Sequence, residues 1–427
     1  MAEFPKGFLW GAASASYQIE GGVHEGGRGE SVWDAFAHTP GKIKNGDTGD
    51  VAADSFRRWR EDVRLVKELG LSAYRFSIAW PRIEPGGGEP WNPEGFAYYD
   101  GLVDALLEAG VQPWVTLYHW DLPQTLQDRG GWQNEDTARA FGAYARRVAD
   151  HFKGRVTHWF TMNEPQCFIG MGYGTGEHAP GLRLRAEDQL LCWRNMLLGH
   201  TLAAKALREA DGANAVGLAS CGGVCYPASE KAEDAEAARR EMFAAPEGFR
   251  GFSHRHLLDP LCLEDGPGKP DFIGLNIYHG TPVRMGEQGP ETVPCSPGSP
   301  RTAFDWPVTP EALEWGPRFI WERYGLPIYL SENGLSCHDW VSLDGKVHDP
   351  QRVDFLQRYL QALARAIAAG VDVRGYFHWA LTDNFEWAAG YSQRFGLVYV
   401  DYATGRRIPK DSAAWYESAA RTNGKII

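Results

Sequence analysis

Eight short runs rich in β-branched and aromatic residues recur along the 427-residue chain, usually some 40 to 60 residues apart, with longer amphipathic stretches between them. Two of these runs, at 111–117 and 271–275, are almost wholly apolar. Continuous apolar runs are typical of parallel strands that are buried on both faces. The eight predicted strands begin near Phe8, Ser72, Gln112, His158, Val216, Asp271, Pro327 and Val373.

The stretches between these runs have helical periodicity. Apolar residues recur every three or four positions over 96–107, and Gly110 follows as a stop signal. Asp349 and Pro350 mark the start of another helix, which Gly370 ends. This alternation predicts an α/β fold, a single (β/α)8 TIM barrel that spans residues 1–427 as one domain. The main alternative, a doubly wound open sheet, lacks a Gly-x-Gly-x-x-Gly after the first strand.

Two segments differ from this pattern. Residues 230–241 are charged and rich in alanine, which predicts a solvated helix. Residues 286–300 are rich in Gly, Pro and Ser, which predicts a long loop after the sixth strand. That loop would lie on the rim where barrel enzymes build their sites.

Charge and cysteine content exclude several classes of partner. The net charge is −12, and no run of Lys and Arg could track phosphates, so we expect no nucleic acid partner. The seven Cys are scattered, and none forms a Cys-x-x-Cys. We therefore expect reduced thiols in a cytoplasmic protein, with no metal site. The first seven residues lack a basic region before an apolar stretch, and no apolar run is long enough to span a membrane, so we expect neither signal peptide nor membrane contact.

Polar side chains gather at the expected carboxyl ends of the strands, where barrel enzymes place catalytic groups. Buried without partners, such groups would be costly, so a polar pocket ringed by indoles is the simpler interpretation. The 17 Trp weakly favour a carbohydrate ligand, because flat indole faces stack on sugars. The segments at the strand ends are 17–20, 74–76, 118–120, 161–165, 276–278, 331–334 and 379–387.

Two glutamates occupy comparable positions, Glu164 after the fourth strand and Glu332 in the seventh, each beside an asparagine. Either one alone could be a salt-bridge partner or a surface residue. Together they would face each other across the barrel mouth. Glycoside hydrolysis requires such a pair, one carboxylic acid that protonates the leaving oxygen and one carboxylate that attacks or activates water.

The chain resembles glycoside hydrolase family 1 over essentially its whole length, with five motifs in the family's order. Each motif alone is short, but five in register are very specific. They are residues 8–22 (FLWGAASASYQIEGG), 74–82 (YRFSIAWPR), Asn163-Glu164-Pro165, Glu332-Asn333-Gly334, and 383–387 (DNFEW) with 394–397 (RFGL).

The resemblance implies a role for each matched position. Glu164 would be the general acid/base and Glu332 the nucleophile, about 5 to 5.5 Å apart as in retaining glycosidases. Arg75 and Tyr278 would contact Glu332 and favour its charged form, although Arg75 could also be a structural ion-pair partner. The residues that would bind the terminal sugar are Gln18, His119, Trp120, Asn163, Tyr278, Trp379, Glu386 and Trp387. Trp120 could instead mainly form a wall of the pocket.

The residues at two positions narrow the range of substrates that the resemblance implies. Glu386 stands where the family's phospho-glycosidases carry a small residue, and its carboxylate would repel a phosphate. The family's plant thioglucosidases lack the acid/base glutamate. Because this chain has Glu164 at that position, O-glycosides are the favoured substrates. The resemblance thus implies a retaining, exo-acting β-glycosidase without cofactor, most simply a β-glucosidase whose substrate is a small β-glycoside. Alternatives are a β-galactosidase or β-fucosidase, an endo-acting β-glycanase, or a non-catalytic sugar-binding relative.

The departures from the family lie on the leaving-group side. Gln166 replaces the Trp that often follows Asn-Glu-Pro, while Trp306 matches an aromatic residue that lines the aglycone entrance. The segment between Tyr226 and Lys269 aligns poorly and is shorter than in relatives. We therefore place Gln166 and Trp306 on the aglycone rim, without predicting aglycone preference. The sequence gives no prediction of oligomeric state.

Overall fold

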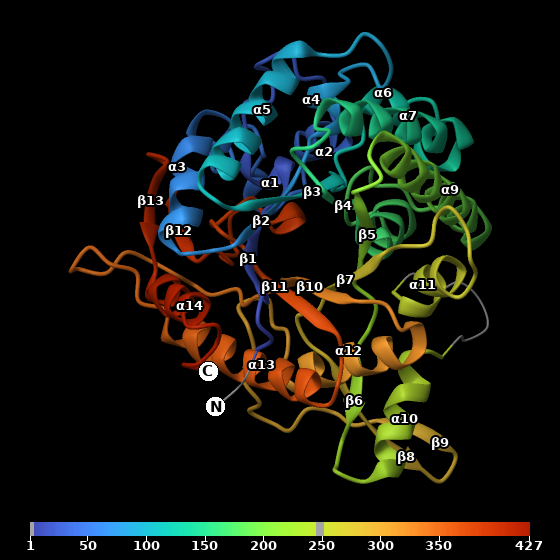
Figure 1. The fold of residues 1–427 in the computed structure, drawn as a ribbon, viewed down its shortest axis with the longest axis vertical. Helices are drawn as coiled ribbons and strands as arrows, with labels where there is room; N and C mark the ends of the chain where they lie inside the picture. The colour runs from blue at the N-terminus through green and yellow to red at the C-terminus, as the bar shows by residue number, and fades with distance from the viewer. Residues whose placement is uncertain (1–3, 245–251) are drawn as a thin grey trace.

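A computed structural model describes residues 4–244 and 252–427 (Figure 1). Residues 1–3, which belong to the N-terminal segment considered for a signal peptide, lie outside the described residues, as do residues 245–251 of the poorly aligned segment. Eight parallel strands close into a barrel in the order β1-β11-β10-β7-β5-β4-β3-β2, which confirms the predicted fold and all eight strands. The barrel strands are β1 (Leu9–Ala13), β2 (Ala73–Ser77), β3 (Gln112–Tyr118), β4 (His158–Asn163), β5 (Ala215–Ser220), β7 (Phe272–Asn276), β10 (Ile328–Asn333) and β11 (Val373–Trp379).

A helix of the outer layer follows each barrel strand, and Figure 1 shows these helices arranged around the strands. They are α3 (Ser55–Glu68), α5 (Pro93–Glu108), α7 (Glu135–His151), α9 (Ala186–Ala210), α11 (His254–Cys262), α12 (Glu311–Tyr324), α13 (Pro350–Ala368) and α14 (Asp411–Arg421). Among the residues that the structure describes, no helix is both long and apolar enough to cross a membrane.

Local signals in the sequence explain where the predicted helices begin and end. The Asn92 side chain accepts a hydrogen bond from the backbone N–H of Glu94 at the start of α5, and Gly110 follows the helix with φ +76°. Pro350 occupies the first turn of α13, as predicted. Asp349, however, does not cap that helix with its side chain. Its carboxylate instead accepts from the backbone N–H of Ser412, which joins α13 to α14.

An aromatic layer fills the lower part of the barrel. Its buried cluster includes at least one residue from each of the eight strands: Ala13, Ala73, Trp114, Phe160, Ala219, Phe272, Tyr329, and both Phe377 and Trp379. The Trp114 ring lies 4.7 Å from that of Tyr329 and 5.4 Å from that of Phe377, measured between centroids. These side chains fill the barrel interior, as is typical of (β/α)8 barrels, whose sites lie at the strand ends.

The shorter elements lie in the connections. They are α1 (Ser16–Ile19), α2 (Val32–Ala37), η1 (Lys44–Gly46), α4 (Trp80–Ile83), α6 (Gln124–Gln127), η2 (Gly131–Gln133), α8 (Pro165–Ile169), η3 (Gly170–Thr175), β6 (Cys225–Pro227), α10 (Ala232–Met242), β8 (Thr281–Gly286), β9 (Gly289–Thr292), η4 (Trp387–Ala389), β12 (Val398–Asp401) and β13 (Arg406–Pro409). The helix α10 confirms the prediction for 230–241.

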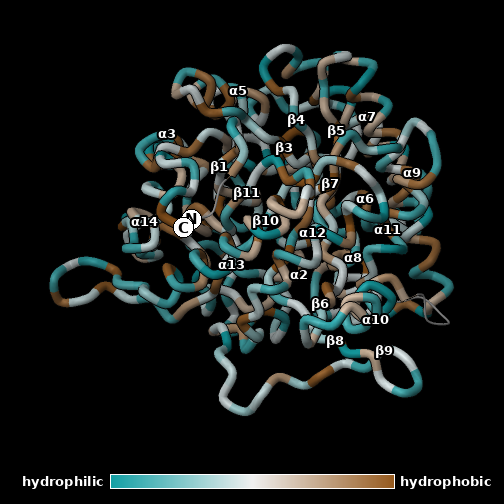
Figure 2. The backbone as a smooth tube through the Cα atoms, turned by 60° about the horizontal axis from the view of Figure 1, so that its bottom comes forward, coloured by the Kyte–Doolittle hydropathy of each residue, from teal (hydrophilic) through white to brown (hydrophobic). Residues whose placement is uncertain are grey.

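The prediction of a continuous loop over 286–300 is wrong in its first part. Residues 289–292 form β9, which pairs antiparallel with β8 in a hairpin that projects from the edge of the molecule (Figure 2). Gly289 has φ +126° and so permits the tight turn. Arg284 and Glu291 pair across the two strands at 3.1 Å. Glycine in this segment therefore makes a turn between strands rather than a long irregular loop.

Candidate active site

A cavity of about 920 Å³ opens at the carboxyl ends of the barrel strands, where the sequence predicted the site. It is lined by residues that follow or end β3, β4, β7, β10 and β11. Of the predicted site residues, those that line it are His119, Trp120, Asn163, Glu164, Tyr278, Trp306, Glu332, Trp379, Glu386 and Trp387.

Irregularities in two strands precede the two glutamates. The pairing of β4 with β5 shifts register between Phe160 and Asn163, and that of β10 with β7 shifts between Leu330 and Glu332. A bulge of this kind changes the direction of the next side chains. Asn163 and Glu332 can therefore both reach the cavity. Glu164 follows β4 with φ +46°, an uncommon left-handed conformation for a residue other than glycine.

Glu332 is almost fully buried and has a cation and a phenol as partners. Its Oε1 lies 2.6 Å from Nη1 of Arg75, and its Oε2 accepts a hydrogen bond of 2.8 Å from the Tyr278 hydroxyl. Arg75 itself is completely buried, and its guanidinium lies 4.7 Å above the Phe160 ring of the aromatic layer. The predicted contacts of Arg75 and Tyr278 with Glu332 are therefore present.

Two asparagines connect the glutamates. The Asn276 Nδ2 donates to Glu164 Oε1 at 2.8 Å and to Asn163 Oδ1 at 3.0 Å, while Asn163 Oδ1 also accepts from Arg75 at 2.6 Å. The hydroxyl of Ser331 orients Asn276 by donating to its Oδ1 at 2.7 Å. Asn276 is a site residue beyond those predicted, although its position at the end of a predicted strand was a signal.

The hydrogen bonds of His119 fix its protonation state. Its Nε2 faces the Nδ2 of Asn163 at 3.0 Å, and because an amide nitrogen only donates, Nε2 must accept. Burial, assisted by the nearby Arg75, holds the pKa of His119 well below its usual range. The ring is therefore neutral with its proton on Nδ1. That buried Nδ1 has no hydrogen-bond partner among the described residues, which leaves a donor available to a ligand.

The two glutamates have different environments. Burial and repulsion by Glu332 raise the pKa of Glu164 to about 7. Burial also raises the pKa of Glu332, but the Arg75 guanidinium and the hydrogen bonds from Arg75 and Tyr278 oppose that increase. The pair therefore loses its first proton from Glu332, and Glu164 is the group that holds a proton longer.

Glu386 is the third carboxyl group of the cavity. Burial and repulsion by Glu332 and Glu164 raise its pKa to about 8, so at neutral pH the carboxyl group is mostly protonated. It can then donate a hydrogen bond as well as accept one. Gln18 lies behind it, with Nε2 at 3.4 Å from Glu386 Oε2 and 3.0 Å from the Phe385 carbonyl. The Oε1 of Gln18 is buried without a partner among the described residues.

Aromatic rings form the walls. The Trp120 and Trp387 rings stack with centroids 4.5 Å apart, and Trp120 donates its indole N–H to the Asn163 carbonyl at 2.9 Å. Trp306, also in the lining, stacks on Phe304 with centroids 4.8 Å apart. Trp306 lines the cavity, and its place on the aglycone rim stays a prediction.

Three predicted residues do not line the cavity. Arg75 supports Glu332 from behind, and Gln18 comes from α1 rather than from the end of β1. The placement of Gln166 on the rim is wrong. Its side chain is completely buried and donates to the Ser220 hydroxyl at 2.8 Å. Cys167 and Cys221, to which the sequence analysis gave no role, line the cavity next to it.

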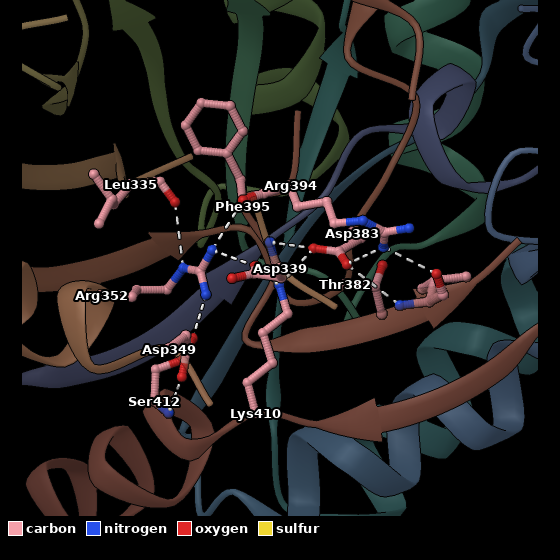
Figure 3. A network of polar contacts seen from close by, with 12 residues as sticks. Leu335, Asp339, Asp349, Arg352, Thr382, Asp383, Arg394, Phe395, Lys410 and Ser412 are labelled. Atoms are coloured by element: carbon pink, nitrogen blue, oxygen red, sulfur yellow. Dashed lines mark hydrogen bonds and ion pairs between the residues drawn. The ribbon is translucent and has the colours of Figure 1, made fainter. Parts of the chain in front are cut away.

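Figure 3 shows a network of buried charges around Asp383. Asp383 begins the segment that carries Glu386 and Trp387, so the network holds this segment in place. The Asp383 carboxylate accepts from Lys410 at 2.7 Å, from Arg394 at 2.5 Å and from the backbone N–H of Gly396 at 3.0 Å. Lys410 also contacts Asp339 at 2.6 Å. Three cations balance three carboxylates in this network: Arg352, Arg394 and Lys410 with Asp339, Asp349 and Asp383.

We expect Lys410→Met to destabilise the fold by roughly 3 kcal/mol or more, because two buried carboxylates lose a common partner. Urea unfolding followed by circular dichroism measures the change. Arg374→Met is the matched control, because Arg374 pairs with Asp372 at the surface, where ion pairs contribute little. Equal unfolding midpoints for the two variants would contradict a structural role for the network.

Comparison with known proteins agrees with this site. The family model "Glycosyl hydrolase family 1" matches residues 1–255 and 264–425. Beta-glucosidase A of Thermotoga maritima is 43% identical over 99% of this chain and 98% of its own. A bifunctional beta-D-glucosidase/beta-D-fucosidase of Bifidobacterium breve is 41% identical over 97% of each chain. The solved structure of the T. maritima beta-glucosidase with glucoimidazole superposes with a TM-score of 0.90 at 42% identity, over 99% of each chain. The chain belongs to glycosyl hydrolase family 1.

Proposed function

We propose that this protein is a retaining, exo-acting β-glucosidase that releases terminal β-D-glucosyl residues from small glycosides by double displacement. One observation carries the proposal: two buried glutamates share one cavity in unlike environments. Glu332 is paired with a guanidinium and a phenol, whereas Glu164 accepts a hydrogen bond from the neutral amide of Asn276. When the pKa values of two carboxyl groups differ, the group with the higher pKa can act as the acid and the ionised group as the nucleophile.

In the first step the Glu332 carboxylate attacks the anomeric carbon while Glu164 gives its proton to the departing oxygen. The bond from the sugar to the leaving group breaks, and a glycosyl ester forms on Glu332. In the second step Glu164, now ionised, takes a proton from water, and the resulting oxygen nucleophile displaces Glu332 with overall retention. This mechanism requires carboxyl groups about 5 to 5.5 Å apart, and that separation stays a prediction.

The remaining cavity residues would bind one sugar. The Nδ1–H of His119 and the Oε1 of Gln18, both buried without partners among the described residues, would bond hydroxyl groups. Asn163 would contact the 2-hydroxyl, and Tyr278 would support Glu332 as well as line the subsite. Trp379 would stack on the ring, with Trp120 and Trp387 at its side. Glu386 would hold the far hydroxyls, and Trp306 would contact the aglycone.

A neutral sugar suits this cavity better than a phosphorylated one. The ionised Glu332 would repel a phosphate in this cavity, and a protonated Glu386 offers a phosphate no positive charge. A protonated Glu386 can adapt to either orientation of the 4-hydroxyl, which keeps β-galactosidase and β-fucosidase activity as the second candidate. The B. breve relative, named a bifunctional beta-D-glucosidase/beta-D-fucosidase, favours this range of substrates.

The whole chain, residues 1–427, would form one catalytic domain without cofactor, acting on a small molecule rather than on nucleic acid or a membrane. We place it in the cytoplasm. All seven cysteines are free thiols. The Sγ atoms of Cys167 and Cys221 lie 3.6 Å apart without a disulfide bond between them. Two thiols so close together fit a reducing compartment.

A panel of nitrophenyl β-glycosides tests the proposal. We expect the glucoside to have the highest kcat/KM, measurable activity on the galactoside and fucoside, and none on the 6-phosphoglucoside. Proton NMR of the first product should show the β anomer. First appearance of the α anomer would disprove retention. No turnover by folded protein on any of these substrates would favour the non-catalytic alternative, and cleavage within long polymers only would favour the endo-acting one.

A further inference from the structure

Two thiols meet beside the proposed acid/base. Cys167 belongs to α8, two residues beyond Pro165, and Cys221 directly follows β5. Their sulfur atoms lie 3.6 Å apart. The two sulfurs and a carboxylate oxygen of Glu164 all lie within 4.8 Å of one another. All three residues line the cavity and are therefore accessible to a small solute.

The spacing of these atoms fits a tetrahedral metal ion. A zinc–sulfur bond of about 2.3 Å and a tetrahedral angle place two thiolate sulfurs about 3.8 Å apart. The observed 3.6 Å is close to that separation. A carboxylate oxygen is a common third ligand, and water from the cavity could occupy the fourth position. Little rearrangement is therefore needed to form the site.

Neighbouring residues hold the thiols in place, as supports around a metal site do. The Cys221 thiol donates to Gln166 Oε1 at 3.8 Å, and Gln166 Nε2 donates to the Ser220 hydroxyl at 2.8 Å. Ser220 in turn contacts His254 Nδ1 at 2.8 Å. The buried Gln166, which replaces the family's frequent Trp, thus orders one side of the thiol pair.

We propose that Cys167, Cys221 and Glu164 form a reversible inhibitory site for a thiophilic divalent cation such as Zn²⁺ or Cd²⁺. The cation forms two metal–sulfur bonds and one bond to the Glu164 carboxylate. Each thiol releases its proton to solvent, and Glu164 releases its own when it is protonated. Soft thiolates select such ions over Mg²⁺ or Ca²⁺. The inhibition, though not the binding, rests on the proposed role of Glu164, since a coordinated carboxylate cannot protonate a leaving group.

Cadmium binding can be measured without any activity. In the absence of added thiols and oxygen, Cd²⁺ titrated into the reduced protein should produce the ultraviolet charge-transfer absorption of cadmium thiolate, saturating at one equivalent. Cys221→Ala and Cys167→Ala should each weaken binding at least tenfold. Cys295→Ala is the matched control, because Cys295 is a free thiol outside this cavity, and it should titrate like the unchanged protein. The same absorption and affinity in Cys221→Ala would overturn the site.

Inhibition is a separate measurement. Zn²⁺ should inhibit hydrolysis of an aryl β-glucoside, and EDTA should restore it. The half-inhibitory concentration should rise at least tenfold in Cys221→Ala and remain unchanged in Cys295→Ala. Unchanged inhibition of Cys221→Ala would overturn the inhibitory role. If the protein proves to hydrolyse no glycoside, the proposed function fails, and the cadmium titration still decides whether the metal site exists.

Discussion

Glu332→Ala is expected to abolish turnover, with kcat lowered by roughly four orders of magnitude or more, as for other removed nucleophiles. The substitution removes the atom that attacks the anomeric carbon and leaves a space where it stood. Azide, a small anion, can enter that space and attack from the same face. Activity on an aryl glucoside with a good leaving group should then return, and the product should be the α-glucosyl azide.

NMR of the azide product provides the decisive measurement. The matched control is Glu322→Ala, an exposed glutamate of α12 to which no role is assigned and which should keep full activity. A β-glucosyl azide from the Glu332 variant would exclude Glu332 as the nucleophile. Undiminished turnover of that variant would remove the proposed mechanism altogether.

Glu164→Ala is the prediction with the second largest effect, and its size should depend on the leaving group. An alkyl or sugar leaving group needs a proton, so cellobiose hydrolysis should fall roughly 10²- to 10⁴-fold. A dinitrophenolate leaves unaided, so its release should change little in the first step. Azide should accelerate the second step, which no longer requires a base, and yield the β-glucosyl azide. Equal losses for both kinds of leaving group would contradict the acid/base role.

The pH profile gives an independent test of the same residue. Glu164 must be protonated in the first step, and its pKa is about 7. Activity should therefore be present below that pH and decline as the pH rises through it, in plots of kcat/KM for cellobiose. With a p-nitrophenyl glucoside, whose leaving group still benefits from protonation, the unchanged protein should show the decline near pH 7 and Glu164→Gln should lack it. Since the pKa of Glu386 is about 8, a decline at higher pH can remain. A decline near pH 7 that persists in Glu164→Gln would assign it to another group.

Opposite stereochemistry makes the two variants an internally consistent test. Azide attacks in place of Glu332 in one variant and in place of water in the other. The α product in the first and the β product in the second together define which face each glutamate occupies. Any other pair of products is incompatible with the division of roles proposed for Glu164 and Glu332.

Much of the fold could be predicted because it depends on local periodicity. Apolar runs such as 111–117 and helical repeats such as 96–107 lie within a few residues of sequence, and the eight strands begin where these patterns change. The two glutamates could be found because parallel strands in a barrel all end at the same mouth. Gly289 shows the limit of local patterns, because a glycine-rich segment is compatible both with a long loop and with the tight turn between β8 and β9.

The supports of the site could not be predicted, because they join residues far apart in sequence. Asn276 contacts Glu164 across 112 positions, and Lys410 contacts Asp383 across 27. Gln166 was expected on the rim, but a bond to Ser220 turns it inward. The thiols of Cys167 and Cys221 meet across 54 positions, and no Cys-x-x-Cys in the sequence indicates this pair.

The sequence alone therefore determined the barrel and the identity of its two acidic strand ends. Only the tertiary structure decided the electrostatic environment of each glutamate. Burial, the Arg75 guanidinium and the repulsion between Glu164 and Glu332 separate their protonation, and each of these depends on distances across the barrel. Periodicity specifies which face of an element is buried, whereas a pKa depends on which charges lie within a few ångströms in three dimensions.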